Sequence, residues 1–196
     1  SITLPFFDDF SYNSSIASTD LWEQSSVFVN STFPINPITI GVATFDGLDE
    51  YGFARDFSQA NSSAPSDTLL SHKIDLSAVN SAYLMFYFQG KGIGDAPQFN
   101  DFLVLEFLNY YLVWEQIWFS EGQSMQEFKK VVQIINDPKF MHNEFQFRFR
   151  NYATISGNFD HWHLDYIKVD EFLNPNDTIT LNDVSFVYAA PSFLKT

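Results

Sequence analysis

The sequence has 196 residues, of which 45% are hydrophobic and 18% aromatic, with 23 phenylalanines and no cysteine. This composition excludes a disordered chain, and the absence of cysteine excludes disulfides, thiolate metal sites and cysteine nucleophiles. The formal net charge of −14 argues against nucleic acid and anionic membrane surfaces as partners, and it suits a hard cation such as calcium.

The chain shows no targeting or membrane signal. No run reaches the roughly 18 apolar residues of a membrane span, and the start, SITLPFFDDF, lacks the basic and apolar regions of a signal peptide. We therefore expect no membrane insertion. If the protein is exported, its leader is absent from this chain.

Apolar patterning predicts β-strands from one end of the chain to the other. Residues 144–151 alternate strictly, with Phe145, Phe147 and Phe149 on one face and the side chains between them, including Arg148 and Arg150, on the other. The run at 81–89 is apolar enough for a strand buried on both faces. A segment rich in serine and proline at 59–67 is predicted to be a solvated loop. In chain order the expected strands are 21–30, 42–46, 81–89, 101–108, 111–119, 127–135, 144–151, 162–169 and 183–188.

Short strands separated by turn signals, without a helical stripe, predict an all-β fold. We expect a two-sheet antiparallel jelly-roll β-sandwich that forms one domain over residues 1–196. Such a domain fits a module of a larger exported protein.

The segment 157–171, GNFDHWHLDYIKVDE, carries an H-x-H pair. On a strand, His161, His163 and Asp165 share one face, and Trp162, Leu164 and Tyr166 share the other. A zinc site needs a third ligand from elsewhere, and the two remaining histidines stand in no spaced motif. We therefore do not expect a zinc enzyme, and we expect one histidine to be exposed while the other forms hydrogen bonds within the sandwich.

Catalytic motifs are absent from the sequence. There is no G-x-S-x-G, and GKGIG stands between two predicted strands instead of before a helix. The alternating acids of a jelly-roll glycanase are also missing, because Glu106 is the only acid inside its strand. We expect a protein that is not an enzyme, and a glycan-active enzyme stays open as an alternative.

Several short motifs together resemble the MAM and laminin-G-like (concanavalin-like) jelly-roll modules. They are IDLS at 74–77, NDFLVLEF at 100–107, the tryptophan strand VWEQIWFSEG at 113–122 and the closing strand DHWHLDYIKVD at 160–170. The start, FFDDFSYN followed by LWEQ, resembles such domains in secreted and surface proteins of Bacteroidota. Animal MAM domains carry disulfides, and this chain departs from them in having no cysteine.

The resemblance implies a non-catalytic binding or adhesion module, secreted or on the cell surface, with a protein or glycan ligand. It also implies a structural calcium ion that ties the first strand to the last, with Asp8, Asp9, Asp46 and Asp165 at the matching positions. Calcium prefers several oxygen ligands, which carboxylates supply. The alternative is that Asp165 accepts hydrogen bonds from a neighbouring loop.

Four further residues are candidates for ligand binding. Trp114 and Trp118 are four residues apart and would share one face of a strand, where they could stack on sugars or pack in the core. Arg148 and Arg150 could hold a carboxylate or a sugar, or pair with surface acids. The alternative functions are a carbohydrate-binding module or glycan-active enzyme, and a structural component of a secretion or gliding-motility assembly.

Overall fold

The protein is a sandwich of two antiparallel β-sheets. A computed structural model describes residues 1–58, 63–124 and 127–171. The elements in these residues are β1 (Phe6–Asp8), β2 (Trp22–Ser25), β3 (Phe28–Asn30), β4 (Val42–Phe45), β5 (Ser63–Ser71), β6 (Ala82–Gly90), β7 (Phe102–Leu108), β8 (Trp114–Glu121), β9 (Lys129–Ile135), a short 3-10 helix (Pro138–Phe140), β10 (Phe147–Thr154) and β11 (Trp162–Glu171).

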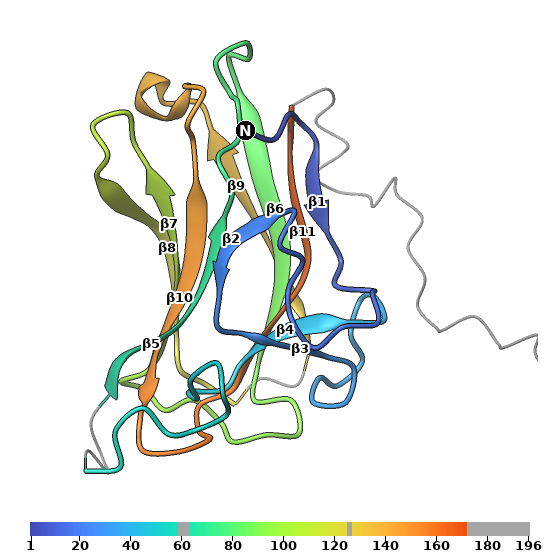
Figure 1. The fold of residues 1–196 in the computed structure, drawn as a ribbon, viewed down its shortest axis with the longest axis vertical. Helices are drawn as coiled ribbons and strands as arrows, with labels where there is room; N and C mark the ends of the chain where they lie inside the picture. Colours follow the sequence, from blue (N-terminus) through green and yellow to red (C-terminus); the bar gives the residue numbers. More distant parts are fainter. Residues whose placement is uncertain (59–62, 125–126, 172–196) are drawn as a thin grey trace, which may run out of the picture.

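The strands form a six-stranded and a five-stranded sheet that face each other (Figure 1). The six-stranded sheet has the order β3-β4-β11-β6-β9, with β1 also paired to β11, and the five-stranded sheet has the order β2-β5-β10-β7-β8. This arrangement confirms the predicted all-β, two-sheet antiparallel sandwich. Within the described residues, no helix has the length and apolar composition needed to cross a membrane.

Most predicted strands are present within a few residues of their expected bounds, but two predictions need correction. The strand predicted at 21–30 is two strands, because the chain leaves the five-stranded sheet after β2 and enters the six-stranded sheet as β3. The loop predicted at 59–67 is wrong over its described part, since β5 begins at Ser63 and Pro65 pairs with Tyr152 of β10. β1 was not predicted, and the strand expected at 183–188 lies outside the described residues.

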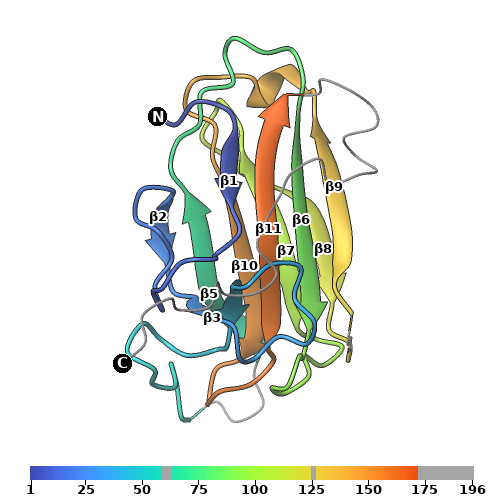
Figure 2. The same cartoon turned by 90° about the vertical axis from the view of Figure 1, so that its right-hand side faces the viewer.

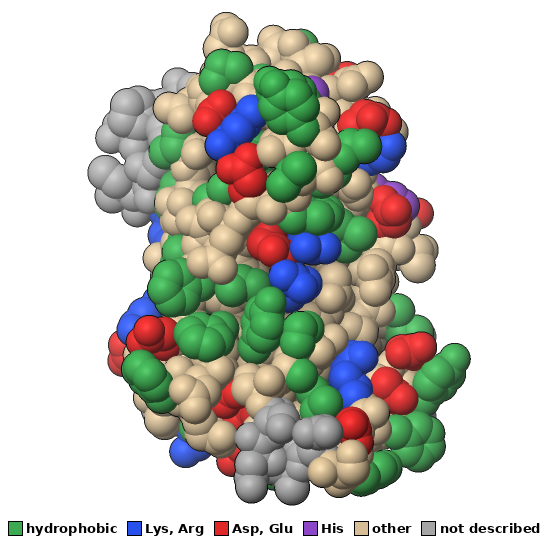
Figure 3. Space-filling model, turned by 90° about the vertical axis from the view of Figure 1, so that its left-hand side faces the viewer, with side chains coloured by type: hydrophobic (Ala, Val, Ile, Leu, Met, Phe, Trp, Pro, Cys, Tyr) green, Lys and Arg blue, Asp and Glu red, His purple; other side chains and the backbone are tan. Residues whose placement is uncertain are grey.

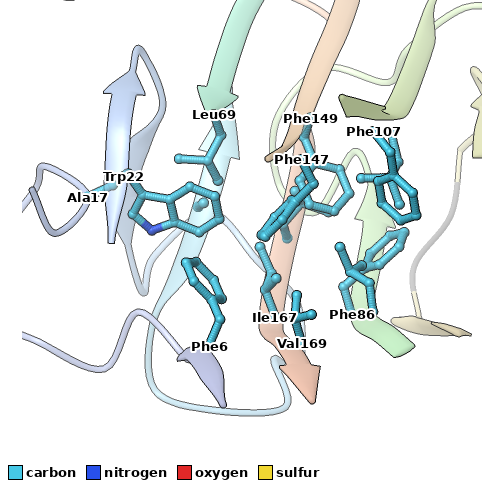
Figure 4. Close-up of a cluster of buried hydrophobic side chains, with 14 of the residues drawn as sticks. Phe6, Ala17, Trp22, Leu69, Phe86, Phe107, Phe147, Phe149, Ile167 and Val169 are labelled. Atoms are coloured by element: carbon cyan, nitrogen blue, oxygen red, sulfur yellow. The ribbon is translucent and has the colours of Figure 1, made fainter. Parts of the chain in front are cut away.

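Aromatic side chains fill the space between the sheets (Figure 4). As the alternation of β10 predicts, Phe147 and Phe149 point into this core. The ring of Phe149 meets Phe86 of the other sheet edge to face at 4.8 Å, and Trp22 packs edge to face on Phe6 and Phe147. Because β10 is pleated, the residues between its phenylalanines point away from the core.

Part of the outer face of the six-stranded sheet, over β6 and β11, is covered by the protein's own chain. Segment 31–41 crosses this face in Figure 2 and is held there by side chains of β6 and β11. Gln89 both donates to and accepts from the backbone of Ile35, and the carboxylate of Asp165 accepts two hydrogen bonds from Thr39. As a result, β11 is buried on both of its faces.

A β-bulge in β11 changes the direction of one predicted side chain. The pairing with β6 shifts between Asp165 and Lys168, and Tyr166 has a positive φ of 52°. Tyr166 therefore lies with Tyr83 and Met85 on the outer side of the sheet. Its predicted placement beside Trp162 and Leu164 is wrong, although those two residues do point into the core.

Candidate functional site

The outer face of the five-stranded sheet carries the candidate site, which we call the arginine face. In Figure 3 this face is towards the viewer, and basic and acidic side chains lie together at its centre among hydrophobic ones. Strands β10, β7 and β8 lie next to one another in the sheet, so their outward residues form a continuous surface. The residues of the arginine face are Phe102, Val104, Glu106, Trp114, Gln116, Phe119, Arg148, Arg150 and Tyr152.

Two arginines share one carboxylate at the centre of this face. Arg148 stands opposite Glu106 in the β10–β7 ladder, and Arg150 follows two residues later on the same side. The Nε atom of Arg148 donates to Glu106 Oε2 at 2.6 Å, and Arg150 donates to both carboxylate oxygens at 2.8 and 3.0 Å. The side chains of Arg148, Arg150 and Glu106 are 22%, 22% and 11% exposed. The cluster is therefore within reach of a ligand and partly shielded from water.

The two arginines keep Glu106 ionised. Burial alone would raise the pKa of Glu106, but the hydrogen bonds from Arg148 and Arg150 outweigh it and lower the pKa below its usual value. A general acid in glycoside hydrolysis needs a raised pKa so that it still carries its proton. Glu106 is thus suited to orient the arginines and unsuited to act as a general acid.

Aromatic rings flank the cluster on both sides. The guanidinium carbon of Arg148 lies 4.1 Å from the centre of the Trp114 ring, and that of Arg150 lies 5.7 Å from the Tyr152 ring. Both arrangements are cation–π contacts, which fix the direction of the guanidinium planes. A row of four side chains therefore crosses the face in the order Trp114, Arg148, Arg150 and Tyr152.

A hollow of about 300 Å³ lies beside this row and is lined by Phe102, Val104, Gln116, Phe119 and Tyr152. Phe119 is 48% exposed, which is unusual for a large apolar side chain within a strand. Apolar walls with a few polar groups are typical of small-ligand sites. The hollow and the arginine cluster together offer both an apolar and a charged contact.

Only one of the two candidate tryptophans belongs to this face. The β7–β8 pairing shifts between Leu105 and Glu106, so β8 contains a bulge between Gln116 and Trp118. The extra residue reverses the alternation, and Trp118 points into the sandwich, where it meets Phe86 at 5.1 Å. The prediction that Trp114 and Trp118 share a face is wrong for this reason. Trp118 packs in the core, as its alternative interpretation held.

The alternation of β10 that marks Arg148 and Arg150 could also have indicated Tyr152, the next outward residue. Phe102, Gln116 and Phe119 carry no comparable signal. Their place on the face depends on which strands are neighbours and on the bulge in β8, and neither can be read from residue spacing.

Two of the predicted calcium ligands are fully engaged by protein donors. The Asp8 carboxylate accepts from Trp22 Nε1 at 2.7 Å and from the Phe10 amide at 2.8 Å. Burial raises its pKa to about 6, and the hydrogen bond from Trp22 opposes this rise. Asp165 is fully buried, and burial raises its pKa to about 7 against the hydrogen bonds from Thr39. Asp165 thus accepts hydrogen bonds from a neighbouring loop, as the alternative interpretation proposed.

The other two aspartates complete their local turns. Asp9 accepts from the Ser11 amide, and Asp46 accepts from the Leu48 amide. The backbone of Asp46 is itself held by the buried carboxylate of Asp67. Among the described residues, no three histidine, aspartate or glutamate side chains gather where they could hold a metal ion. The four aspartates are therefore not arranged to share one calcium ion, and calcium binding stays a prediction.

Both histidines of the H-x-H pair are buried, so the expectation that one of them is exposed is wrong: the loops that carry Phe33 and Asp95 cover His161. His163 is fully buried, and its ring nitrogens contact Thr44 Oγ1 at 2.8 Å and the Lys91 carbonyl at 3.2 Å. Burial lowers its pKa to about 4, so it is neutral at pH 7. His161 stacks on Phe33 and accepts from the Asp95 amide. Both histidines serve to hold loops against β11.

A second cleft, of about 870 Å³, lies between segment 10–15 and β3. Its lining residues are polar or apolar and none is charged; they include Ser11, Asn13 and Asn30. The hydroxyl of Tyr12 in this cleft is already used by Asp8 and by the backbone of Ser18. The cleft offers hydrogen bonds but no charged group, and it lacks the row of aromatic rings found on the arginine face.

Comparison with known proteins shows likeness in fold alone. No protein-family model matches the sequence, and no curated protein matches it. The K1 cleaved adhesin domain of Lys-gingipain from Porphyromonas gingivalis W83 is similar with a TM-score of 0.51 at 10% identity, over 85% of this chain and 98% of that one. At this identity the similarity supports the β-sandwich fold and nothing finer.

Two carbohydrate-binding modules have lower scores. The C-terminal family 22 module of Clostridium thermocellum Xyn10B has a TM-score of 0.49 at 8% identity, over 85% of this chain and 92% of that one. The CBM22-1 xylan-binding domain of Paenibacillus barcinonensis Xyn10C has 0.46 at 9% identity, over 84% and 92%. The finer resemblance to MAM and laminin-G-like modules stays a prediction.

Proposed function

We propose that this chain is a non-catalytic adhesion module of an exported bacterial surface protein and that it binds a glycan through the arginine face. The observation that carries this proposal is the contrast between the two sheets. Segment 31–41 covers the part of the six-stranded sheet around Gln89 and Asp165, whereas aromatic rings and a polar cluster stand open at the centre of the five-stranded sheet. Exposed aromatic groups arranged around polar ones are characteristic of binding surfaces.

The chemistry of the face suits a sugar chain. Aromatic rings pack against apolar surfaces with the area and rigidity that recognition needs, and the C–H faces of sugar rings are such surfaces. Arginine and glutamate side chains form charge-assisted hydrogen bonds with hydroxyl groups. On the arginine face both kinds of group lie on neighbouring strands, so one extended ligand can reach them together.

The fold likeness to the K1 cleaved adhesin domain of Lys-gingipain supports an adhesion role at a surface. The proposed Bacteroidota origin depends on the resemblance of the opening motifs, FFDDFSYN and LWEQ. The acidic composition of the chain is compatible with this location.

A protein partner is the second candidate, and one observation favours it. The hairpin tip between β7 and β8, residues 110–113, exposes the four side chains Tyr110, Tyr111, Leu112 and Val113. Exposed apolar groups that are contiguous in this way mark protein contacts. This tip would serve the assembly role expected of a component of a larger surface complex.

Glycan-array binding by the wild type and by Trp114→Ala tests the proposal. We expect the wild type to bind at least one glycan class, and Trp114→Ala to bind it about tenfold or more weakly, the size typical of a central aromatic contact. Tyr51→Ala removes an aromatic ring that is 78% exposed and lies outside the face, and it should bind as the wild type does. Asn13→Ala probes the second cleft.

An array without any signal would refute glycan binding. If Asn13→Ala lost binding while Trp114→Ala kept it, the ligand would occupy the second cleft and the assignment of the arginine face would be wrong.

A further inference from the structure

We propose that the arginine face selects a glycan with an isolated acidic sugar, whose carboxylate is bound by Arg148 and Arg150. This inference rests on the proposed function and adds the chemical class of the ligand. It predicts that the recognised group is a uronic acid residue within a mainly neutral chain.

The charge of the cluster is the first argument. Two guanidinium groups surround the single carboxylate of Glu106, so the cluster carries one excess positive charge. The whole protein has only 10 lysines and arginines against 24 acids. An excess of positive charge in such a protein, placed on an open face beside aromatic rings, is a specific attraction for an anion.

The unused donors are the second argument. Arg148 donates to Glu106 through Nε, and within the described residues its hydrogen bonds use that atom alone. A guanidinium group has five N–H donors in a planar fork that matches a carboxylate. The ring of Trp114 lies under this guanidinium and fixes its plane. The Nη edge is thus oriented before a ligand arrives, which reduces the entropy lost on binding.

The partial burial of the cluster is the third argument. With side chains 22% exposed, Arg148 and Arg150 have lost much of their hydration in the free protein. A carboxylate that joins them forms charge-assisted bonds in a medium less polar than bulk water, where such bonds are stronger.

The charge of the remaining surface limits the ligand further. At a net charge of −14 the protein repels a polymer that has a carboxylate on every sugar. A single carboxylate among neutral sugars avoids this repulsion, because the neighbouring sugars can lie on Trp114, Tyr152 and the hollow next to them. The face therefore matches an occasional acidic residue better than a continuous polyanion.

Calorimetric titration with gellan fragments tests the inference, because their glucuronate residues are separated by neutral sugars. The matched probe is the same preparation after chemical reduction of its carboxyl groups, and polygalacturonate is the continuous polyanion. We expect the wild type to bind native fragments about tenfold or more tightly than reduced ones, and more tightly than polygalacturonate.

Variants at the cluster assign the effect to it. Arg148→Gln should lose the preference for native over reduced fragments, and Arg148→Lys should keep part of it, since the charge remains but the planar fork is lost. Unfolding curves of each variant show whether it is folded.

The outcomes separate this inference from the proposed function. Equal binding of native and reduced fragments would overturn the acidic-sugar assignment and leave a neutral-glycan module. Tighter binding of polygalacturonate than of gellan would overturn the preference for isolated acids. An absence of binding to all three, together with an empty glycan array, would overturn both.

Discussion

Replacement of Asp165 by asparagine should make the protein more stable at pH 8 while changing it much less at pH 5. Asp165 is fully buried, and burial raises its pKa to about 7 from 3.8. A carboxyl group with a raised pKa contributes stability that is complete below the unfolded pKa and is lost as the pH rises through the folded value. The full effect of this linkage is about 4 kcal/mol, and more than half of it falls between pH 5 and pH 8.

Asparagine fits the geometry of this site. Its carbonyl oxygen can accept from the Thr39 amide, as Asp165 Oδ2 does at 2.9 Å. Its amide can donate to Thr39 Oγ1, whose hydroxyl then donates to the Asp9 carbonyl, 2.7 Å away. The variant therefore removes the titration of the carboxyl group and keeps the contacts that hold segment 31–41.

The assay is urea unfolding, followed by tryptophan fluorescence, of the wild type and Asp165→Asn at pH 5, 6, 7 and 8. Burial lowers the pKa of His163 to about 4, so its contribution to the stability of the protein decreases as the pH falls below 6.5. In the wild type this opposes the gain in stability that Asp165 provides at low pH. Because both proteins contain His163, the difference between them cancels this contribution. We expect the difference to grow by about 2–3 kcal/mol in favour of the variant from pH 5 to pH 8.

A difference that stays constant across this range, or that grows in favour of the wild type, would refute the reasoning. Asp20→Asn, the same substitution at an exposed position, is the control.

Further measurements address other parts of the molecule. Trp22→Phe removes a donor from the buried Asp8 carboxylate, and we expect a loss of about 2–3 kcal/mol in urea unfolding at pH 8; an unchanged stability would contradict the role of this bond. Phe86→Ala empties the centre of the core and should cost about 3–5 kcal/mol, whereas the exposed Tyr51→Ala should cost less than about 0.5 kcal/mol. Calcium titration of the melting temperature tests the predicted ion: a rise with calcium that a chelator reverses would support it, and an unchanged melting temperature would refute it and agree with the protein donors that already occupy Asp8 and Asp165.

The strands that could be predicted are those whose side chains alternate or are apolar throughout. Both β10 and β6 follow such patterns because each lies inside its sheet and packs against the core. The sequence pattern did not predict β5, because SAPSDTLLS contains proline and small polar residues, which have low strand propensity. Pro65 lies beyond the part of β5 that pairs with β2, so on that side no partner requires its missing N–H.

The candidate site was predicted only in part for a related reason. Arg148 and Arg150 follow from the alternation of one strand, but Glu106 joins them through the β7–β10 register, and that register is a property of the fold. The bulges at Ile117 in β8 and Tyr166 in β11 reversed two predicted side-chain directions. A bulge adds one residue to a strand without a clear signal in composition, and alternation read across it gives the wrong face.

The bulge in β8 also bears on whether another molecule can pair with the edge of this sheet. Within the described residues β8 is the last strand of its sheet, and a flat terminal strand would offer its free amides and carbonyls to a strand of another molecule. The extra residue interrupts that row of groups and twists the strand. Deletion of Ile117 would restore a regular edge while Gln116 and Trp118 keep their present faces. We expect such a deletion to favour edge-to-edge association between molecules.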